Sequence, residues 1–150
     1  LFVGRVRCVE ETAGNIVTED GEVLGKHDGL FNYTIGQRKG LGIAYKHPLY
    51  VIGFNGDRNE VIVGPNERLF TNRMICKFYN FLDDTIHKEL KAEGKIRYAA
   101  NPSPCTARIL DDDTMEVIFE EPQRAITPGQ SVAFYNGTQL LGGAVIDRVC

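Results

Sequence analysis

The sequence predicts a mainly β protein, in which a small β-rich central domain with a short helical segment precedes a six-stranded antiparallel β-barrel. Two observations support this prediction. The 150 residues include 16 glycines but only scattered helical periodicity, which is typical of short strands joined by tight turns. Six strand-like runs also follow one another late in the chain without a crossover helix. Such runs form a small antiparallel barrel or sandwich, and closure into a barrel removes exposed sheet edges.

A change of pattern near the middle of the chain predicts two domains. Pro65-Asn66 interrupts the strands, and a new set of strands begins after Arg68, which predicts a boundary within residues 65–72. We therefore expect an irregular N-terminal segment at 1–13, a central domain at 14–70 and a barrel domain at 71–150.

The elements of the central domain are predicted from its turns. Residues 16–24 contain two apolar runs around Asp20-Gly21, the dipeptide that a type I′ hairpin turn prefers. Residues 27–37 have mixed apolar spacing, which favours a helical turn or two leading into a glycine loop. A second hairpin is expected from the apolar runs 50–54 and 60–64, with a longer turn between them.

The barrel domain is expected to begin with a strand at 74–81. Residues 83–94 are ambiguous between a short helix and a loop followed by strand entry. Five further strands are predicted at 95–98, 105–110, 115–119, 131–135 and 140–146, with tight turns at Asp112-Asp113 and Asn136-Gly137. Within the strand 95–98, Arg97 and Tyr98 would face opposite sides.

Composition and charge exclude several classes of protein. With 43% hydrophobic and 25% charged residues the chain is globular, and neither an apolar run of roughly 18 residues nor a signal peptide is visible. We expect a soluble, cytoplasmic protein. The net charge of -3 excludes a uniformly basic surface, so that contact with nucleic acid requires local patches. The candidates are Arg38 with Lys39, and Lys88, Lys91 and Lys95 with Arg97.

The four cysteines, Cys8, Cys76, Cys105 and Cys150, lie far apart, without a CxxC pair or a histidine at metal-ligand spacing. We therefore expect no metal site. Cys76 and Cys105 lie within apolar strand patterns and are predicted to be buried, reduced thiols. Cys8 is not expected to be catalytic.

The segment from Tyr33 to Ile43 combines three glycines with the adjacent cations Arg38 and Lys39. Glycine allows φ > 0 and the close approach of a partner, while Arg and Lys bind phosphate oxygens. The loop therefore indicates contact with a polyanion. His27, near a turn, is expected to be a hydrogen-bonding structural residue rather than an acid or base.

Four motifs in order resemble the bacterial tRNA-specific 2-thiouridylase family. They are Gly25-Lys26-His27-Asp28-Gly29, residues 33–43, Lys95-Ile96-Arg97-Tyr98 and Ile126-Thr127-Pro128-Gly129-Gln130, and the closing Leu141-Gly142-Gly143-Ala144 also matches. The resemblance implies an enzyme that activates the C2 carbonyl oxygen of the wobble uridine with ATP and replaces it with persulfide sulfur from a sulfur-donor protein. The family's N-terminal catalytic domain carries a Ser-Gly-Gly loop and two cysteines, which are not recognised here. The chain is thus expected to comprise the central and C-terminal domains, inactive alone and without a cofactor.

By the same resemblance, Arg97, Tyr98 and Gln130 are expected to bind the anticodon arm of tRNA. Gln37, Arg38 and Lys39 are expected to contact either RNA or the missing catalytic domain. One departure is Ala99-Ala100, where the family often has a polar pair, so any contact made by those side chains is absent.

Two other functions are compatible with the sequence. The chain could be a stand-alone barrel that docks onto protein, resembling the second domain of translation factors, with the glycine loop as its docking surface. A self-contained enzyme is least favoured, because no pair of nucleophile and base can be named.

Overall fold

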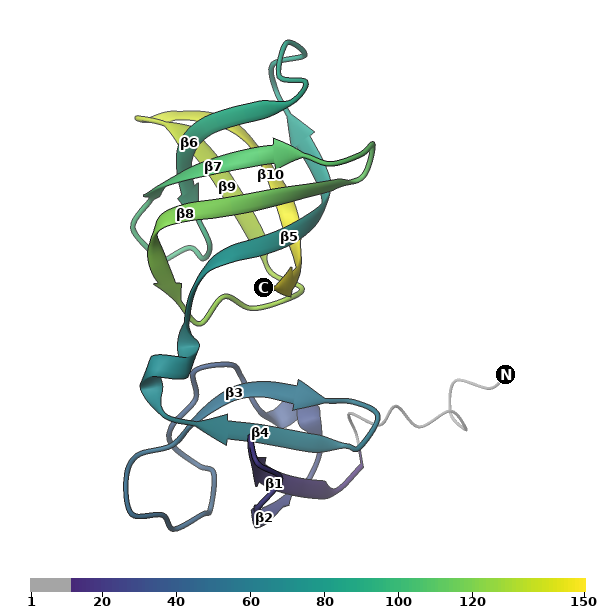
Figure 1. Ribbon diagram of the computed structural model, residues 1–150, viewed down its shortest axis with the longest axis vertical. Helices are drawn as coiled ribbons and strands as arrows, with labels where there is room; N and C mark the ends of the chain where they lie inside the picture. The colour runs from purple at the N-terminus through teal and green to yellow at the C-terminus, as the bar shows by residue number, and fades with distance from the viewer. Residues whose placement is uncertain (1–11) are drawn as a thin grey trace, which may run out of the picture. The chain divides into compact units, whose positions relative to one another are not determined.

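The computed structural model describes residues 12–150 as two compact units, one ending at Leu69 and the other comprising Phe70–Cys150 (Figure 1). Both units consist mainly of strands, which confirms the predicted fold class. Cys8 and most of the predicted N-terminal segment 1–13 lie outside the described residues. Among residues 12–150, no helix has the length and apolarity required to cross a membrane.

The first unit contains a mixed four-stranded sheet with the strand order β2-β1-β4-β3. Both predicted hairpins are present as antiparallel pairs, β1 with β2 and β3 with β4. They are joined by parallel pairing of β1 with β4, in which Ile16 lies opposite Val61. The strands are β1 (Gly14–Thr18), β2 (Val23–His27), β3 (Tyr50–Asn55) and β4 (Glu60–Gly64).

The first hairpin turn differs from the predicted type I′ turn. The connection between β1 and β2 is four residues long, and the Thr18 N–H donates to the Glu22 carbonyl at 2.9 Å. Gly21 has a φ of 88°, whereas Asp20 is not among the residues with positive φ. A type I′ turn requires positive φ at both central residues, so the Asp-Gly pair here closes a longer loop.

The sheet of the first unit is covered by residues of its loops. Ile16, Val51 and Val61 are fully buried, and Leu41 and Leu49 from the long loop before β3 pack into the same core. A 3₁₀ turn, η2 (Leu30–Asn32), precedes the glycine loop, as predicted, and a second, η3 (Asn66–Leu69), precedes strand β5 (Phe70–Phe81). Leu41 and Leu49 thus anchor the part of the loop that lies between them, before β3.

The second unit is the predicted six-stranded antiparallel barrel, closed in the order β10-β5-β8-β7-β6-β9. Each neighbouring pair around the barrel is antiparallel. Its strands are β5 (Phe70–Phe81), β6 (Glu89–Lys95), β7 (Ser103–Ile109), β8 (Thr114–Arg124), β9 (Ser131–Asn136) and β10 (Gln139–Val149). The predicted turns at Asp112-Asp113 and Asn136-Gly137 connect β7 to β8 and β9 to β10.

The predicted strand at 95–98 is wrong. The second barrel strand is β6, which ends at Lys95, and Arg97 and Tyr98 lie in the turn that follows. The inner face of β6 is inconspicuous in sequence because it includes Gly94, where an added Cβ would lie 2.9 Å from the Phe119 ring. The large Phe119 side chain therefore requires a glycine opposite it. Arg97 and Tyr98 consequently do not alternate across a sheet.

Candidate nucleic-acid interface

The turn after β6 presents a highly exposed aromatic side chain. Tyr98 is 96% exposed, and the Nζ atom of Lys95 lies 5.3 Å from the centroid of its ring. An exposed ring can stack on a nucleobase, and a neighbouring ammonium can contact phosphate. From the sequence, Lys95 was only one member of a basic patch. The structure makes it the cation beside Tyr98.

The rest of that predicted patch is less basic than the sequence suggests. Lys91 and Lys95 occupy the same face of β6 as Glu89 and Glu93, because residues two apart on a strand share a face. Glu89 also forms an ion pair of 3.4 Å with Arg108. The outer face of β6 is therefore of mixed charge, and the candidate interface lies at the turn that follows the strand.

Arg97 braces the main chain in this structure. Its Nη2 atom donates to the carbonyl oxygens of Arg124 at 2.5 Å and Ala125 at 2.8 Å. Ala125 is buried with a φ of 56°, a left-handed conformation that costs a non-glycine residue about 1–2 kcal/mol. The hydroxyl of Thr127 also donates to the Ala125 carbonyl at 3.0 Å. Arg97 therefore holds the connection between β8 and β9 in a strained conformation.

That connection carries Gln130 on a defined turn. The Gln130 N–H donates to the Thr127 carbonyl at 3.2 Å, and Gly129 has a φ of 90°. Proline followed by a glycine of positive φ is typical of a type II turn. Two hydrogen bonds of 2.8 Å with Ile146 then fix the turn to β10. The exposed Gln130 side chain is thus presented from a rigid backbone.

Arg97, Tyr98 and Gln130 therefore belong to one end of the barrel. Figure 1 shows the turn after β6 and the connection between β8 and β9 at the end where β5 begins and β10 finishes. The acidic turn Asp111–Asp113 lies at the opposite end of β8, an 11-residue strand whose fully extended length is about 35 Å at 3.3 Å per residue. Repulsion of phosphate by this turn is screened over such a distance.

In the glycine loop of the first unit, the predicted residues Gln37, Arg38 and Lys39 differ in their roles. The Gln37 side chain accepts from the Thr34 N–H at 3.0 Å and donates to the Lys39 carbonyl at 2.9 Å. Its main-chain carbonyl accepts from the Val51 N–H at 2.9 Å. Gln37 therefore shapes the loop, whereas Arg38 and Lys39 are exposed to solvent.

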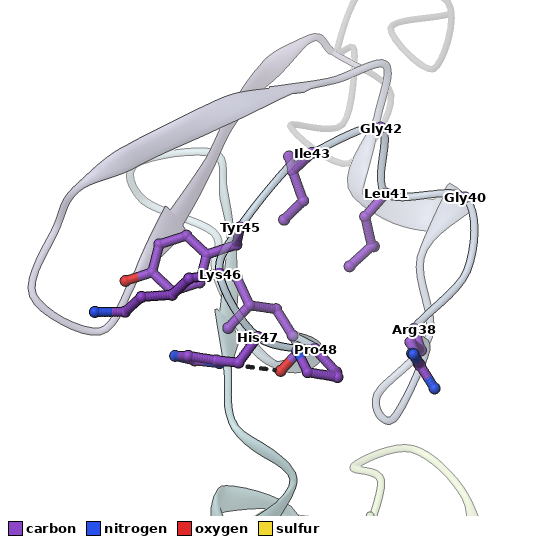
Figure 2. Close-up of a pocket in the computed structure, with 10 residues that line it drawn as sticks. Arg38, Gly40, Leu41, Gly42, Ile43, Tyr45, Lys46, His47 and Pro48 are labelled. Atoms are coloured by element: carbon purple, nitrogen blue, oxygen red, sulfur yellow. Dashed lines mark hydrogen bonds between the residues drawn. The ribbon is translucent and has the colours of Figure 1, made fainter.

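A surface pocket of about 440 Å³ lies along the same loop (Figure 2). It is lined by Arg38 and, farther along the loop, by Tyr45, Lys46 and His47. The last three were missed in the sequence because they follow the glycine motif in an irregular segment without periodicity. The adjacency of an aromatic residue and two basic residues was the available signal.

His27 has the structural role expected of it. The side chain is 1% exposed, and its Nδ1 atom accepts from the Gly29 N–H at 3.0 Å. Nε2 lies 2.8 Å from the Asn59 carbonyl oxygen. Because a carbonyl can only accept, Nε2 carries the proton and donates it. The imidazole thus joins the end of β2 to the start of β4.

The barrel thiols are unsuited to nucleophilic chemistry. Cys76 and Cys105 are free and buried, as predicted, and burial raises the pKa of each thiol to about 12. The nucleophile is the thiolate, which is scarcely populated at neutral pH with such a pKa. Within the described part of the chain, no three His, Cys, Asp or Glu side chains are grouped to hold a metal ion.

Comparison with protein families matches both units. Residues 5–65 match a family described as the tRNA methyl transferase PRC-barrel domain. Residues 71–146 match a family described as the Aminomethyltransferase beta-barrel domain. Together the two matches cover most of the chain.

Three curated relatives of the chain share one name. The chain is 46% identical over 136 residues to the tRNA-specific 2-thiouridylase MnmA of Clostridioides difficile, covering 90% of the chain and 38% of the relative. It is 43% identical over 146 residues to the protein of that name from Geobacter metallireducens, covering 97% and 40%. For Geotalea uraniireducens the identity is 44% over 147 residues, covering 98% and 39%. The chain thus spans about two fifths of the length of these relatives.

Proposed function

The chain belongs to the tRNA-specific 2-thiouridylase family, and from this premise we propose that it is the tRNA-binding part of an enzyme that 2-thiolates the wobble uridine. The resemblance indicated by the ordered motifs is confirmed at the level of the family. Relatives of that name are more than twice as long as the matched region, which supports assigning the chemistry to a further domain of the whole protein.

The observation that carries the proposal is the arrangement at one end of the barrel. Tyr98 offers an almost fully exposed ring beside Lys95, and Gln130 lies on a turn fixed to β10. Arg97 joins the two segments through main-chain carbonyls. In our proposal Tyr98 stacks on a base, Lys95 contacts phosphate, and Gln130 hydrogen-bonds to a sugar or base edge. The exposed part of Arg97 contacts phosphate as a secondary role.

We propose that ATP and persulfide chemistry belong to another part of the whole protein. The sequence contains no Ser-Gly-Gly segment, and the two buried barrel thiols are protonated at neutral pH. We therefore assign adenylation and sulfur transfer to a catalytic domain outside these residues. That domain and a sulfur-donor protein are the proposed partners in the cytoplasm. The role of this chain is to hold the anticodon arm.

The proposal is tested by titrating the full chain with a tRNA transcript and, in parallel, with heparin. Because the proposed site recognises a base and a sugar as well as phosphate, we expect tighter binding of tRNA than of heparin at equal ionic strength. Equal affinity would reduce the interaction to non-specific attraction between charges. Absence of tRNA binding would contradict the proposal.

A further inference from the structure

The loop from Arg38 to Leu49 in the first unit, which lines the pocket, is held in place by buried leucine side chains. Leu41 and Leu49 are 6% and 7% exposed and pack into the core of the unit. Between them the chain forms no strand or helix, so its N–H groups do not belong to a sheet ladder. The loop is therefore anchored at these two points, and Ile43 between them also packs against the core, whereas Gly42 and residues 44–48 are exposed to solvent.

The charge of the pocket is positive although the chain is acidic overall. The sequence carries 20 acidic and 17 basic side chains, yet the pocket-lining residues of the described chain include Arg38, Lys46 and His47 and no Asp or Glu. Figure 2 shows Arg38 on one side of the loop and Lys46 on the other, with Leu41 and Ile43 between them. Two cations on opposite rims favour a ligand with two anionic groups.

An aromatic group adjoins one of these cations. Tyr45 is 38% exposed, and its ring meets the His47 ring edge-on, with centroids 4.9 Å apart and an interplanar angle of 86°. Lys46 Nζ lies 6.0 Å from the Tyr45 centroid. The contacts with His47 and Lys46 orient the Tyr45 ring, and its exposed part is accessible to a flat ligand. The site thus combines stacking with positive charge.

Glycines permit close approach on the opposite wall. Gly40 and Gly42 have φ values of 78° and 66°, a region that favours glycine. Nothing lies within 4 Å of the position that a Gly42 Cβ would occupy. A ligand can therefore touch the main chain there. The volume of about 440 Å³ falls within the range of roughly 300–1,000 Å³ typical of small-ligand sites.

We propose that this loop binds one nucleotide within single-stranded RNA, with the base against Tyr45 and the two flanking phosphates at Arg38 and Lys46. A nucleotide inside a strand has a phosphate on each side, which matches cations on two rims better than a free monophosphate does. The proposal deepens the proposed function and depends on it only for the identity of the RNA. It adds an RNA contact in the first unit.

The test measures the anisotropy of a fluorescein-labelled, single-stranded RNA octamer titrated with the full chain. Because base stacking on one aromatic residue contributes strongly to affinity, Tyr45→Ala is expected to raise Kd roughly tenfold. Arg38→Ala and Lys46→Ala should each lower the slope of log K against log salt by about 0.7. The matched controls, Phe54→Ala and Lys26→Ala, change an exposed aromatic and an exposed lysine outside the pocket and should leave both quantities unchanged.

A second measurement distinguishes the source of the nucleotide. Calorimetric titration should show uridine 3′,5′-bisphosphate binding more tightly than uridine monophosphate, and Lys46→Ala should remove the difference. Equal binding of the two would overturn the two-phosphate site. Octamer binding by the Tyr45 and Lys46 variants that matches the unmodified chain would overturn the inference as a whole.

A barrel variant and the pocket variants together test the two proposals separately. If Tyr98→Ala weakens tRNA binding while the pocket variants bind RNA normally, the pocket inference fails and the proposed function stands. If the chain binds the octamer through Tyr45 but does not bind tRNA, the proposed function fails and the pocket remains.

Discussion

The guanidinium of Arg97 donates a hydrogen bond of 2.8 Å to the main-chain carbonyl of Ala125, 28 residues later in the chain. Ala125 has a left-handed backbone conformation, so the bond holds a segment that would otherwise relax. The same arginine precedes the exposed Tyr98, and the segment it holds leads to Gln130. Arg97 was expected to contact RNA directly. It also positions Tyr98 and Gln130, the side chains that we propose bind RNA.

Removal of the Arg97 side chain should therefore reduce stability as well as binding. Arg97→Ala leaves the Arg124 and Ala125 carbonyls without this donor, and the free energy of unfolding should fall by about 1–3 kcal/mol. Urea denaturation measures the change. The control Lys91→Ala, at an exposed position of β6, should stay within about 0.5 kcal/mol of the unmodified chain. Weaker tRNA binding at unchanged stability would instead assign Arg97 to phosphate alone.

Removal of the Tyr98 side chain should weaken tRNA binding without reducing stability. With 96% of its surface exposed, replacement by alanine should change the free energy of unfolding by less than about 0.5 kcal/mol. Loss of a stacked base should raise the Kd for tRNA by roughly 5- to 100-fold. Fluorescence anisotropy with labelled tRNA measures this, and Tyr98→Phe should retain most of the affinity. Phe78→Ala, at another exposed aromatic of the barrel, is the matched control. Equal losses in both alanine variants would argue against a specific stack.

The parts of the fold that depend on local chemistry could be predicted. Both hairpins follow from apolar runs separated by turn residues, and the Pro128-Gly129 pair predicts the turn that carries Gln130. The parallel pairing of β1 with β4 could not be predicted, because it joins segments more than 40 residues apart and leaves no mark on either strand.

The misplaced strand at 95–98 has a different cause. Ile96 and Tyr98 are typical strand residues, but Ile96 is buried just after β6 ends and Tyr98 projects into solvent. In β6 itself the inward positions include Ala92 and Gly94, whose small size reflects the space occupied by Phe119. A strand that packs with small residues shows little hydrophobic alternation. The partners of Arg97 and the pocket around Tyr45 likewise depend on tertiary contacts that a sequence does not display.

His27 offers a test of the first unit. Replacement by alanine removes the acceptor for the Gly29 N–H and the donor for the Asn59 carbonyl, and it leaves a cavity at a position that is 1% exposed. The free energy of unfolding should fall by about 2–4 kcal/mol. Denaturation followed by far-ultraviolet circular dichroism measures the loss. His47→Ala, at an exposed position of the same unit, should have little effect on stability. Comparable changes in the two variants would contradict the structural role of His27.

The raised pKa values of the buried thiols predict how the stability of the barrel changes at alkaline pH. The pKa of Cys76 and of Cys105 is raised by burial from 9.0 to about 12. Above pH 9 the unfolded chain therefore loses protons that the folded chain retains, so stability is constant below that pH with respect to these groups and falls as pH rises toward 12. Linkage limits the decrease to about 1.4 kcal/mol per pH unit for each thiol.

The thiol contribution can be isolated by comparison with a variant, because lysines and tyrosines also titrate in this range. Urea denaturation of the unmodified chain and of the Cys76→Ala/Cys105→Ala variant should give a stability difference that is constant between pH 7 and 8.5. Above pH 9 the difference should shrink, since only the unmodified chain carries the two thiols. Iodoacetamide should correspondingly label Cys150, which is exposed, in the folded state and label the barrel cysteines only after unfolding. Labelling of Cys76 or Cys105 at the rate of Cys150 in the native chain, or a stability difference independent of pH up to 12, would contradict the burial on which this prediction rests.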